Sequence, residues 1–193
     1  QAKSIADQIH ALRQKAAGEI SKHIEATLSH LGMPQVRFTV EVESQDELLS
    51  TGCDKVRFMF SSNEKLTAQA VEKIASGGEI SRVMLALKAL LASKSQLPTI
   101  IFDEIDTGVS GRIADAMGEI IESLSSNMQV VSITHLPQVA SKGESHFVVY
   151  KQNSVTNIAR LDAEQRVEEI AKMLSGSVIS AAALEQARLL LGK

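Results

Sequence analysis

Two short apolar runs, separated by a segment of helical length, constrain the fold of this chain more than any other feature. LPTIIFDE occupies residues 97–104 and MQVVSITH occupies residues 128–135. Continuous apolar runs bounded by turn residues are typical of strands buried on both faces of a parallel sheet. Residues from about 110 to 126 have the pattern of a helix. This order predicts a β-α-β unit with two parallel strands and a right-handed crossover.

Both predicted strands end in ionisable side chains. Asp103 and Glu104 close the first strand, and His135 follows the second. Ligands of open parallel sheets bind outside the carboxyl ends of the strands, so we expect these three side chains at one edge. Two adjacent carboxylates need a cation or water there, because burying a dry and unpaired charge is costly.

These residue types suit phosphoryl transfer. A Mg²⁺ ion held through its water shell by Asp103, and a nucleophilic water oriented by Glu104, would give each carboxylate a role. His135 would contact the terminal phosphate. Alternatively, it is a surface or capping histidine after a strand.

A pair of glycines, Gly77 and Gly78, stands directly before a helix predicted from about 79 to 93. Ser76 and Glu79 match a capping box, in which Ser76 accepts a backbone N–H and Glu79 reaches back to the cap. A helix N-terminus with bare backbone donors before it is also a ready site for phosphate. The residues alone leave both interpretations open.

The remaining segments complete an expected α/β fold. Apolar residues over 5–31 recur every three or four positions and predict one long amphipathic helix. Their mean spacing of roughly 3.7 is slightly above the ~3.5 of a left-handed coiled coil. The other expected elements are a hairpin of 36–43 with 55–62, a closing hairpin of 146–152 with 155–161, and helices at 163–174 and 180–191. We therefore predict a coiled-coil stub at 1–32 and an α/β domain at 33–193.

Composition argues against several other classes of protein. A net charge of −3, 3% aromatic residues and no tryptophan argue against a nucleic-acid binder built on a basic face or a stacking platform. No apolar run approaches the ~20 residues of a membrane span, so we expect no membrane association. The single cysteine, Cys53, excludes an internal disulfide framework and a CxxC zinc pair. We expect a fragment of a cytosolic protein, since no signal-peptide pattern follows Gln1.

The order of three motifs resembles the head of ABC-type ATPases: SGGE before a helix, TIIFDEID on a strand and SITH on the next strand. Longer segments, ASGGEISRVMLALKALLA, PTIIFDEIDTGVSGRIADAMG and QVVSITHLPQVAS, resemble RecN, a bacterial family of SMC-like proteins in DNA double-strand break repair. The resemblance covers at least residues 73–150. DTGVSG and THLPQVA are specific to that family rather than to ABC proteins in general.

The resemblance implies a role for each motif residue at the strand edge. Asp103 would be the Walker B aspartate at Mg²⁺, Glu104 the catalytic base and His135 the switch histidine. Many ABC cassettes carry a D-loop aspartate where this chain has Ser110, so that role is not carried over.

The glycine motif would act across a dimer. By the same resemblance, Ser76, Gly77, Gly78 and Glu79 form the signature motif, which meets the γ-phosphate of ATP bound on a second head. This interpretation explains the glycines by the close approach of phosphate.

The Walker A loop, G-x-x-x-x-G-K-[ST], does not occur in the sequence. In RecN-like and SMC-like proteins it lies in an N-terminal half, beyond a long antiparallel coiled coil. The resemblance therefore implies the C-terminal lobe of a split ATPase head, with a mostly parallel sheet flanked by helices. The lobe alone is expected to be inactive.

The expected partners are ATP, the chain's own N-terminal lobe, the second head of a homodimer, and DNA through the full-length protein. The expected location is the cytoplasm, at the nucleoid. Two alternatives remain, namely a head fragment of another SMC-like or ABC ATPase, and a non-catalytic dimerisation module that keeps the fold.

Overall fold

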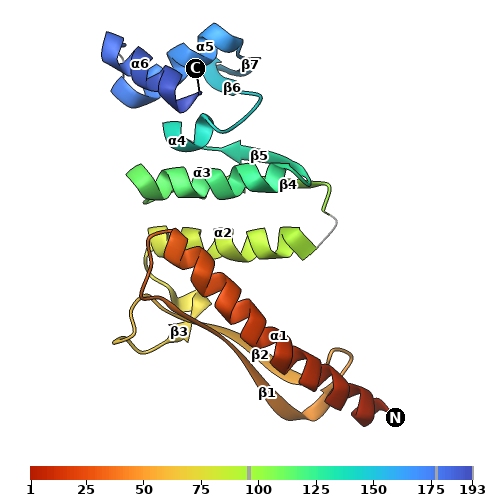
Figure 1. The fold of residues 1–193 in the computed structure, drawn as a ribbon. Helices are drawn as coiled ribbons and strands as arrows, with labels where there is room; N and C mark the ends of the chain where they lie inside the picture. The colour runs from red at the N-terminus through yellow and green to blue at the C-terminus, as the bar shows by residue number, and fades with distance from the viewer. Residues whose placement is uncertain (95–96, 177, 193) are drawn as a thin grey trace. The chain divides into compact units, whose positions relative to one another are not determined.

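The computed structural model describes residues 1–94, 97–176 and 178–192 (Figure 1). The chain divides into two compact units, Gln1–Leu91 and Ala92–Lys193, and each is described by itself. Among the described residues, no helix combines the length and apolarity that a membrane crossing needs.

The first unit is built on one long helix and a hairpin. Helix α1 (Ala2–His30) lies along strands β1 (Arg37–Leu49) and β2 (Gly52–Ser61), as Figure 1 shows. The strands pair antiparallel, with a register shift between Ser44 and Leu49. The predicted helix and hairpin are both confirmed.

The core of this unit lies where the C-terminal half of α1 meets the hairpin. Ile24 and Leu28 of α1 and Phe38 and Phe60 of the strands are almost completely buried. Large apolar side chains of this kind each contribute about 1.5–3 kcal/mol when fully buried. The periodicity over 5–31 therefore correctly indicated an amphipathic helix, since its C-terminal apolar residues form this core. The unit also contains strand β3 (Gln69–Ala70), the 3₁₀ helix η1 (Val71–Lys73) and most of helix α2 (Gly77–Lys94).

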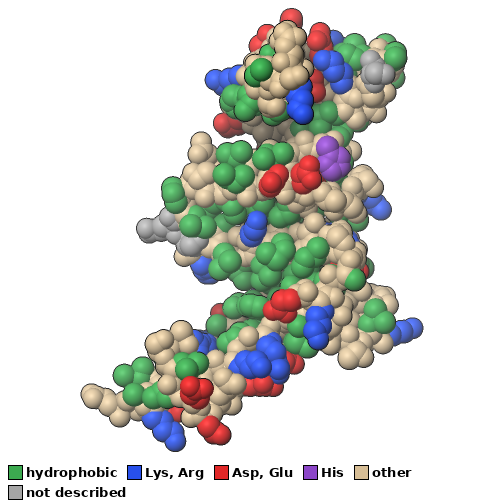
Figure 2. Space-filling view, turned by 180° about the vertical axis from the view of Figure 1, so that it is seen from behind, with side chains coloured by type: hydrophobic (Ala, Val, Ile, Leu, Met, Phe, Trp, Pro, Cys, Tyr) green, Lys and Arg blue, Asp and Glu red, His purple; other side chains and the backbone are tan. Residues whose placement is uncertain are grey.

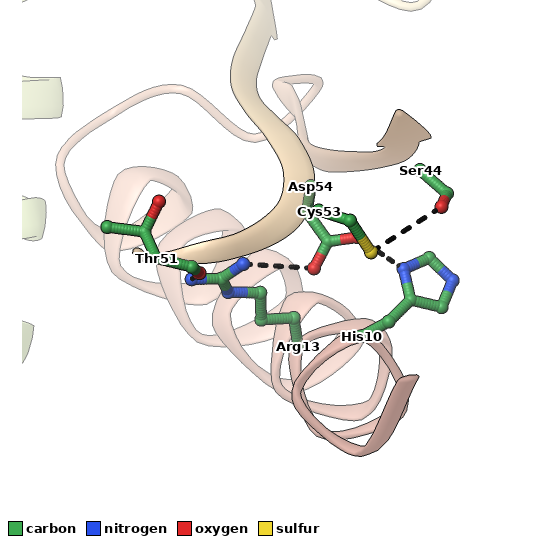
Figure 3. Close-up of polar contacts among 6 residues, drawn as sticks. All are labelled: His10, Arg13, Ser44, Thr51, Cys53 and Asp54. Carbon is green, nitrogen blue, oxygen red and sulfur yellow. Dashed lines mark hydrogen bonds and ion pairs between the residues drawn. The ribbon is translucent and has the colours of Figure 1, made fainter. Parts of the chain in front are cut away.

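A partly buried ionic cluster links α1 to the start of β2 (Figure 3). The carboxylate oxygens of Asp54 lie 2.6 Å from Nδ1 of His10 and 2.9 Å from Nη1 of Arg13. Nη2 of Arg13 also donates to the Thr51 carbonyl at 2.8 Å. Burial alone raises the pKa of the Asp54 carboxyl, but the hydrogen bonds and charges of His10 and Arg13 outweigh it, and the pKa lies below its ordinary 3.8.

We expect Asp54→Asn to lower the melting temperature of the chain at neutral pH. A carboxyl whose pKa is lower in the folded state stabilises the fold above its unfolded pKa, and this contribution is lost as the pH falls through the folded pKa. The difference in melting temperature between wild type and variant should therefore be full at pH 7 and smaller in acid, at a pH well below the ordinary 3.8 of an aspartate.

Glu43→Gln is the matched control for this prediction. Glu43 lies 2.5 Å from Arg57 on the same hairpin, but both side chains are exposed, and surface ion pairs contribute little. Thermal unfolding followed by circular dichroism measures both variants. An Asp54→Asn deficit of equal size at both pH values would contradict the prediction.

The second unit contains the predicted β-α-β segment. Strands β4 (Thr99–Asp103) and β5 (Gln129–Ile133) are parallel, and helix α3 (Gly111–Ser125) connects them in sequence. Helix α3 packs against β5 and against the short helix α4 (Pro137–Ala140) (Figure 1). The expected α/β fold with a parallel sheet and flanking helices is confirmed.

The strands of this sheet are not buried on both faces, and in that respect the sequence-based expectation was wrong. Phe102 is fully buried, but Ile101, Val131 and Ile133 are 59%, 42% and 52% exposed. Nothing among the described residues of this unit covers that face, and hydrophobic side chains are visible at the surface in Figure 2. These strands therefore carry apolar side chains that no described part of this unit buries.

A hairpin and two helices complete the second unit. Strands β6 (Phe147–Gln152) and β7 (Val155–Arg160) pair antiparallel, as predicted. Helices α5 (Ala163–Ser175) and α6 (Ala181–Leu190) pack on each other through a small apolar cluster. Its buried members are Val167, Ile170, Ala171, Ala183 and Ala187.

Candidate active site

The carboxyl edge of the parallel strands brings three predicted site residues together. Asp103, the last residue of β4, pairs in register with Ile133, the last residue of β5. The next residue, Glu104, donates its backbone N–H to the Ile133 carbonyl at 3.0 Å, and His135 follows two residues after Ile133. All three ionisable side chains are exposed, so the edge is open to a ligand from solvent.

Glu104 has a strained backbone. Its φ of 46° lies in the left-handed region, which L-residues other than glycine seldom adopt. Thr107 holds this conformation, because its N–H and hydroxyl donate to the Glu104 carbonyl at 3.2 and 2.9 Å. Such strain costs on the order of 1–3 kcal/mol and concentrates at functional sites. The conformation therefore supports a functional hypothesis for Glu104.

The donor chemistry of this edge fits Mg²⁺. Among the described residues, no three His, Cys, Asp or Glu side chains form a ready metal cluster. Mg²⁺ commonly uses one or two carboxylates together with water and substrate phosphates, which does not require such a cluster. Asp103 offers an exposed carboxylate of the required kind.

The glycine motif lies in the first unit, at the beginning of α2. The helix starts at Gly77, and the Ser76 hydroxyl accepts the Glu79 N–H at 3.4 Å, which is a long capping bond. A Cβ placed on Gly77 would meet no atom within 4 Å. Steric space in this unit therefore does not require glycine at position 77, so the glycine either serves only to begin α2 or allows a ligand or partner to approach.

Arg82 ties the motif to the end of α1, a role that the sequence analysis missed. Its Nε donates to the Gly78 carbonyl at 2.9 Å and its Nη1 to the Leu31 carbonyl at 3.1 Å. Glu79 and Arg82 also line a shallow pocket of about 380 Å³ with seven residues of neighbouring loops. An arginine near a helix N-terminus carries no sequence signal for such a contact, because its partner at residue 31 is distant in sequence.

Asp106 and Thr134 form a second contact that the sequence analysis missed. The Thr134 hydroxyl donates to Oδ2 of Asp106, and the same hydroxyl accepts the Leu136 N–H at 3.0 Å. Asp106 is only 1% exposed. Ser110 is the N-cap residue of α3 in this structure.

The comparisons with solved structures define the class of the fold. A chain solved in work on ATP-driven dimerisation and DNA-stimulated activation of SMC ATPases matches with a TM-score of 0.61 and 16% identity, over 88% of this chain and 99% of that one. An Smc head domain with a coiled coil and joint from Pyrococcus yayanosii matches with a TM-score of 0.69 and 18% identity, over 85% of this chain and 30% of that one. The fold is that of SMC ATPase heads.

Curated proteins with a similar sequence are DNA repair proteins. The DNA repair protein RecN of Vibrio cholerae is 40% identical over 192 residues, which is 96% of this chain and 34% of that protein. RecN of Rickettsia typhi is 40% identical over 97% of this chain and 34% of its own length. No family model matches. The chain is RecN-like over nearly its whole length, and it spans about a third of the length of these curated relatives.

Proposed function

We propose that this chain is the C-terminal lobe of the ATPase head of a RecN-like DNA repair protein. The observation that carries the proposal is the gathering of Asp103, Glu104 and His135 at one strand edge, in a chain 40% identical to RecN over 96% of its length. In the full-length protein the head would hydrolyse ATP in DNA double-strand break repair and recombination. The protein would act in the cytoplasm, on the nucleoid.

The strand edge supplies three different functions in this proposal. The Glu104 carboxylate would orient the attacking water and accept its proton. The His135 ring would donate a hydrogen bond to the terminal phosphate of ATP. Asp103 would hold Mg²⁺, which would neutralise charge on the phosphates when bound.

The signature motif supplies its function to another head. One of the solved SMC ATPase structures comes from work on ATP-driven dimerisation. In this chain Ser76, Gly77 and Gly78 would contact the γ-phosphate of ATP on a second copy of the head. The open space at the Gly77 Cα supports such a close approach.

Exposed apolar faces support a missing N-terminal lobe as a further partner. The uncovered face of β4 and β5 carries Ile101, Val131 and Ile133, and the hairpin of β6 and β7 exposes further large side chains. They are Phe147, Val149, Tyr150, Val155 and Ile158. Soluble monomers seldom expose large contiguous apolar patches, which mark interaction sites. On α1, Ile5 and Leu12 are exposed in the same way, which supports a continuing coiled coil at 1–32.

We expect no ATP turnover from residues 1–193 alone, and turnover once the N-terminal lobe with its Walker A loop is added. Phosphoryl transfer needs the triphosphate held in line, and two carboxylates repel it unless metal and P-loop neutralise the charge. Phosphate release measured for each lobe and for the mixture tests the proposal. Turnover by the chain alone that disappears in Glu104→Gln, so that contamination is excluded, would contradict it.

A further inference from the structure

We propose that Asp106 and Thr134 position Glu104 and His135 relative to each other. The proposal rests on the function proposed above and adds two positioning residues to it. Asp106 lies two residues after Glu104, in the turn that follows β4, and Thr134 immediately precedes His135 after β5. The hydrogen bond between their side chains joins the two turns directly.

The Thr134 hydroxyl fixes the backbone on both sides of His135. It donates to the Asp106 carboxylate and accepts the N–H of Leu136, so one oxygen atom restrains the residues before and after the histidine. When a threonine hydroxyl accepts the backbone N–H two residues later, the two residues form a local turn, which restrains the backbone of the residue between them. The direction in which the His135 side chain projects from the backbone therefore depends on this hydroxyl.

The turn that carries Glu104 is restrained from the same strand. The Glu104 N–H bonds to the Ile133 carbonyl at 3.0 Å, one residue before Thr134. The left-handed backbone of Glu104 is thus held between Ile133 and the Asp106–Thr134 contact. Losing the side-chain contact would leave the turn with one cross-strand restraint in place of two.

Stability alone does not explain why a buried aspartate stands at position 106. The residue is 1% exposed, and its Oδ1 is buried without a hydrogen-bond partner among the described residues. A buried polar group with an unsatisfied oxygen carries a desolvation cost that one hydrogen bond does not recover fully. Each such group calls for an explanation, and positioning of the catalytic edge provides one.

The test is steady-state ATP hydrolysis by the full-length protein with substitutions at the two positions. Thr134→Val keeps the shape of the side chain and removes the hydroxyl. We expect kcat to fall by about 10- to 100-fold, because small misplacements of catalytic groups have effects of that size, while KM for ATP stays within about twofold. Thr134→Ser keeps the hydroxyl and should return kcat to within about threefold of wild type.

Variants of Asp106 test whether loss of the hydrogen bond to Thr134 causes the fall in kcat. Asp106→Asn keeps an acceptor for Thr134 and should retain most of kcat, whereas Asp106→Ala should match Thr134→Val. The double variant Asp106→Ala/Thr134→Val should lose no more than either single variant, because both remove one contact. If Thr134→Val fails to fold, the comparison of kcat between Asp106→Asn and Asp106→Ala decides. Equal losses of kcat in these two variants would overturn the proposal.

Two controls separate this inference from the proposed function. Thr99→Val removes a hydroxyl that donates to Gln129 at 3.1 Å at the amino end of the same strand pair, and kcat should not change. Glu104→Gln tests the proposed function itself. Wild-type kcat in Thr134→Val together with loss in Glu104→Gln would overturn the positioning role alone, whereas wild-type kcat in Glu104→Gln would overturn the proposed function.

Discussion

Replacing Glu104 with glutamine in the full-length protein is expected to slow ATP hydrolysis by at least ~100-fold and to leave nucleotide binding nearly intact. Glutamine has almost the same shape as glutamate, so the left-handed turn and its bonds to Ile133 and Thr107 should persist. Only the carboxylate that accepts the proton of the attacking water is removed. Single-turnover hydrolysis, with ATP binding measured separately, checks both halves of this expectation.

Glu122→Gln provides the control for lost negative charge. Glu122 is exposed near the C-terminal end of α3, whereas Glu104 follows the carboxyl end of β4, and substitution of Glu122 should leave hydrolysis unchanged. A change of less than about threefold in Glu104→Gln would remove Glu104 from the catalytic role, given effects of ~100-fold or more for loss of a general base.

The elements and the strand edge were predictable because their signals are local. Two apolar runs on either side of a helical segment define β4, α3 and β5, and the polar residues that end each run place Asp103, Glu104 and His135 together. The short helix α4 was missed although Pro137 at its first turn is a usual helix start. A single helical turn offers no apolar periodicity to detect.

Contacts between distant residues could not be predicted in the same way. Asp54 pairs with residues 41 and 44 positions earlier, and Asp106 pairs with a residue 28 positions later. Nothing in either local sequence distinguishes these aspartates from solvated ones. The prediction that β4 and β5 are buried on both faces was wrong for a related reason. The apolar residues of a strand do not reveal whether the surface that packs on them belongs to the same chain.

Gly77→Val is expected to abolish ATP-dependent dimerisation of the full-length protein without unfolding it. If phosphate of a second head approaches the Gly77 backbone, a branched side chain there would block that approach. The fold itself has room, since a Cβ at this position meets no atom within 4 Å. Each head should still bind ATP, because the predicted Walker A loop lies in the other lobe. Sizing chromatography with and without ATP measures the dimer.

Alanine substitutions distinguish a role of Gly77 in forming the helix from a role in contacting the ligand. Gly77 and Gly18 both lie in helices, and a Cβ on either meets no atom within 4 Å. Alanine is favoured over glycine in a helix interior by about 1 kcal/mol, so Gly18→Ala should slightly raise the melting temperature, and Gly77→Ala, at the first residue of α2, should preserve it. Only Gly77→Ala should weaken the ATP-dependent dimer, because only Gly77 would face phosphate. A normal dimer peak for Gly77→Val would instead favour the capping box, in which the glycine pair serves only to begin α2.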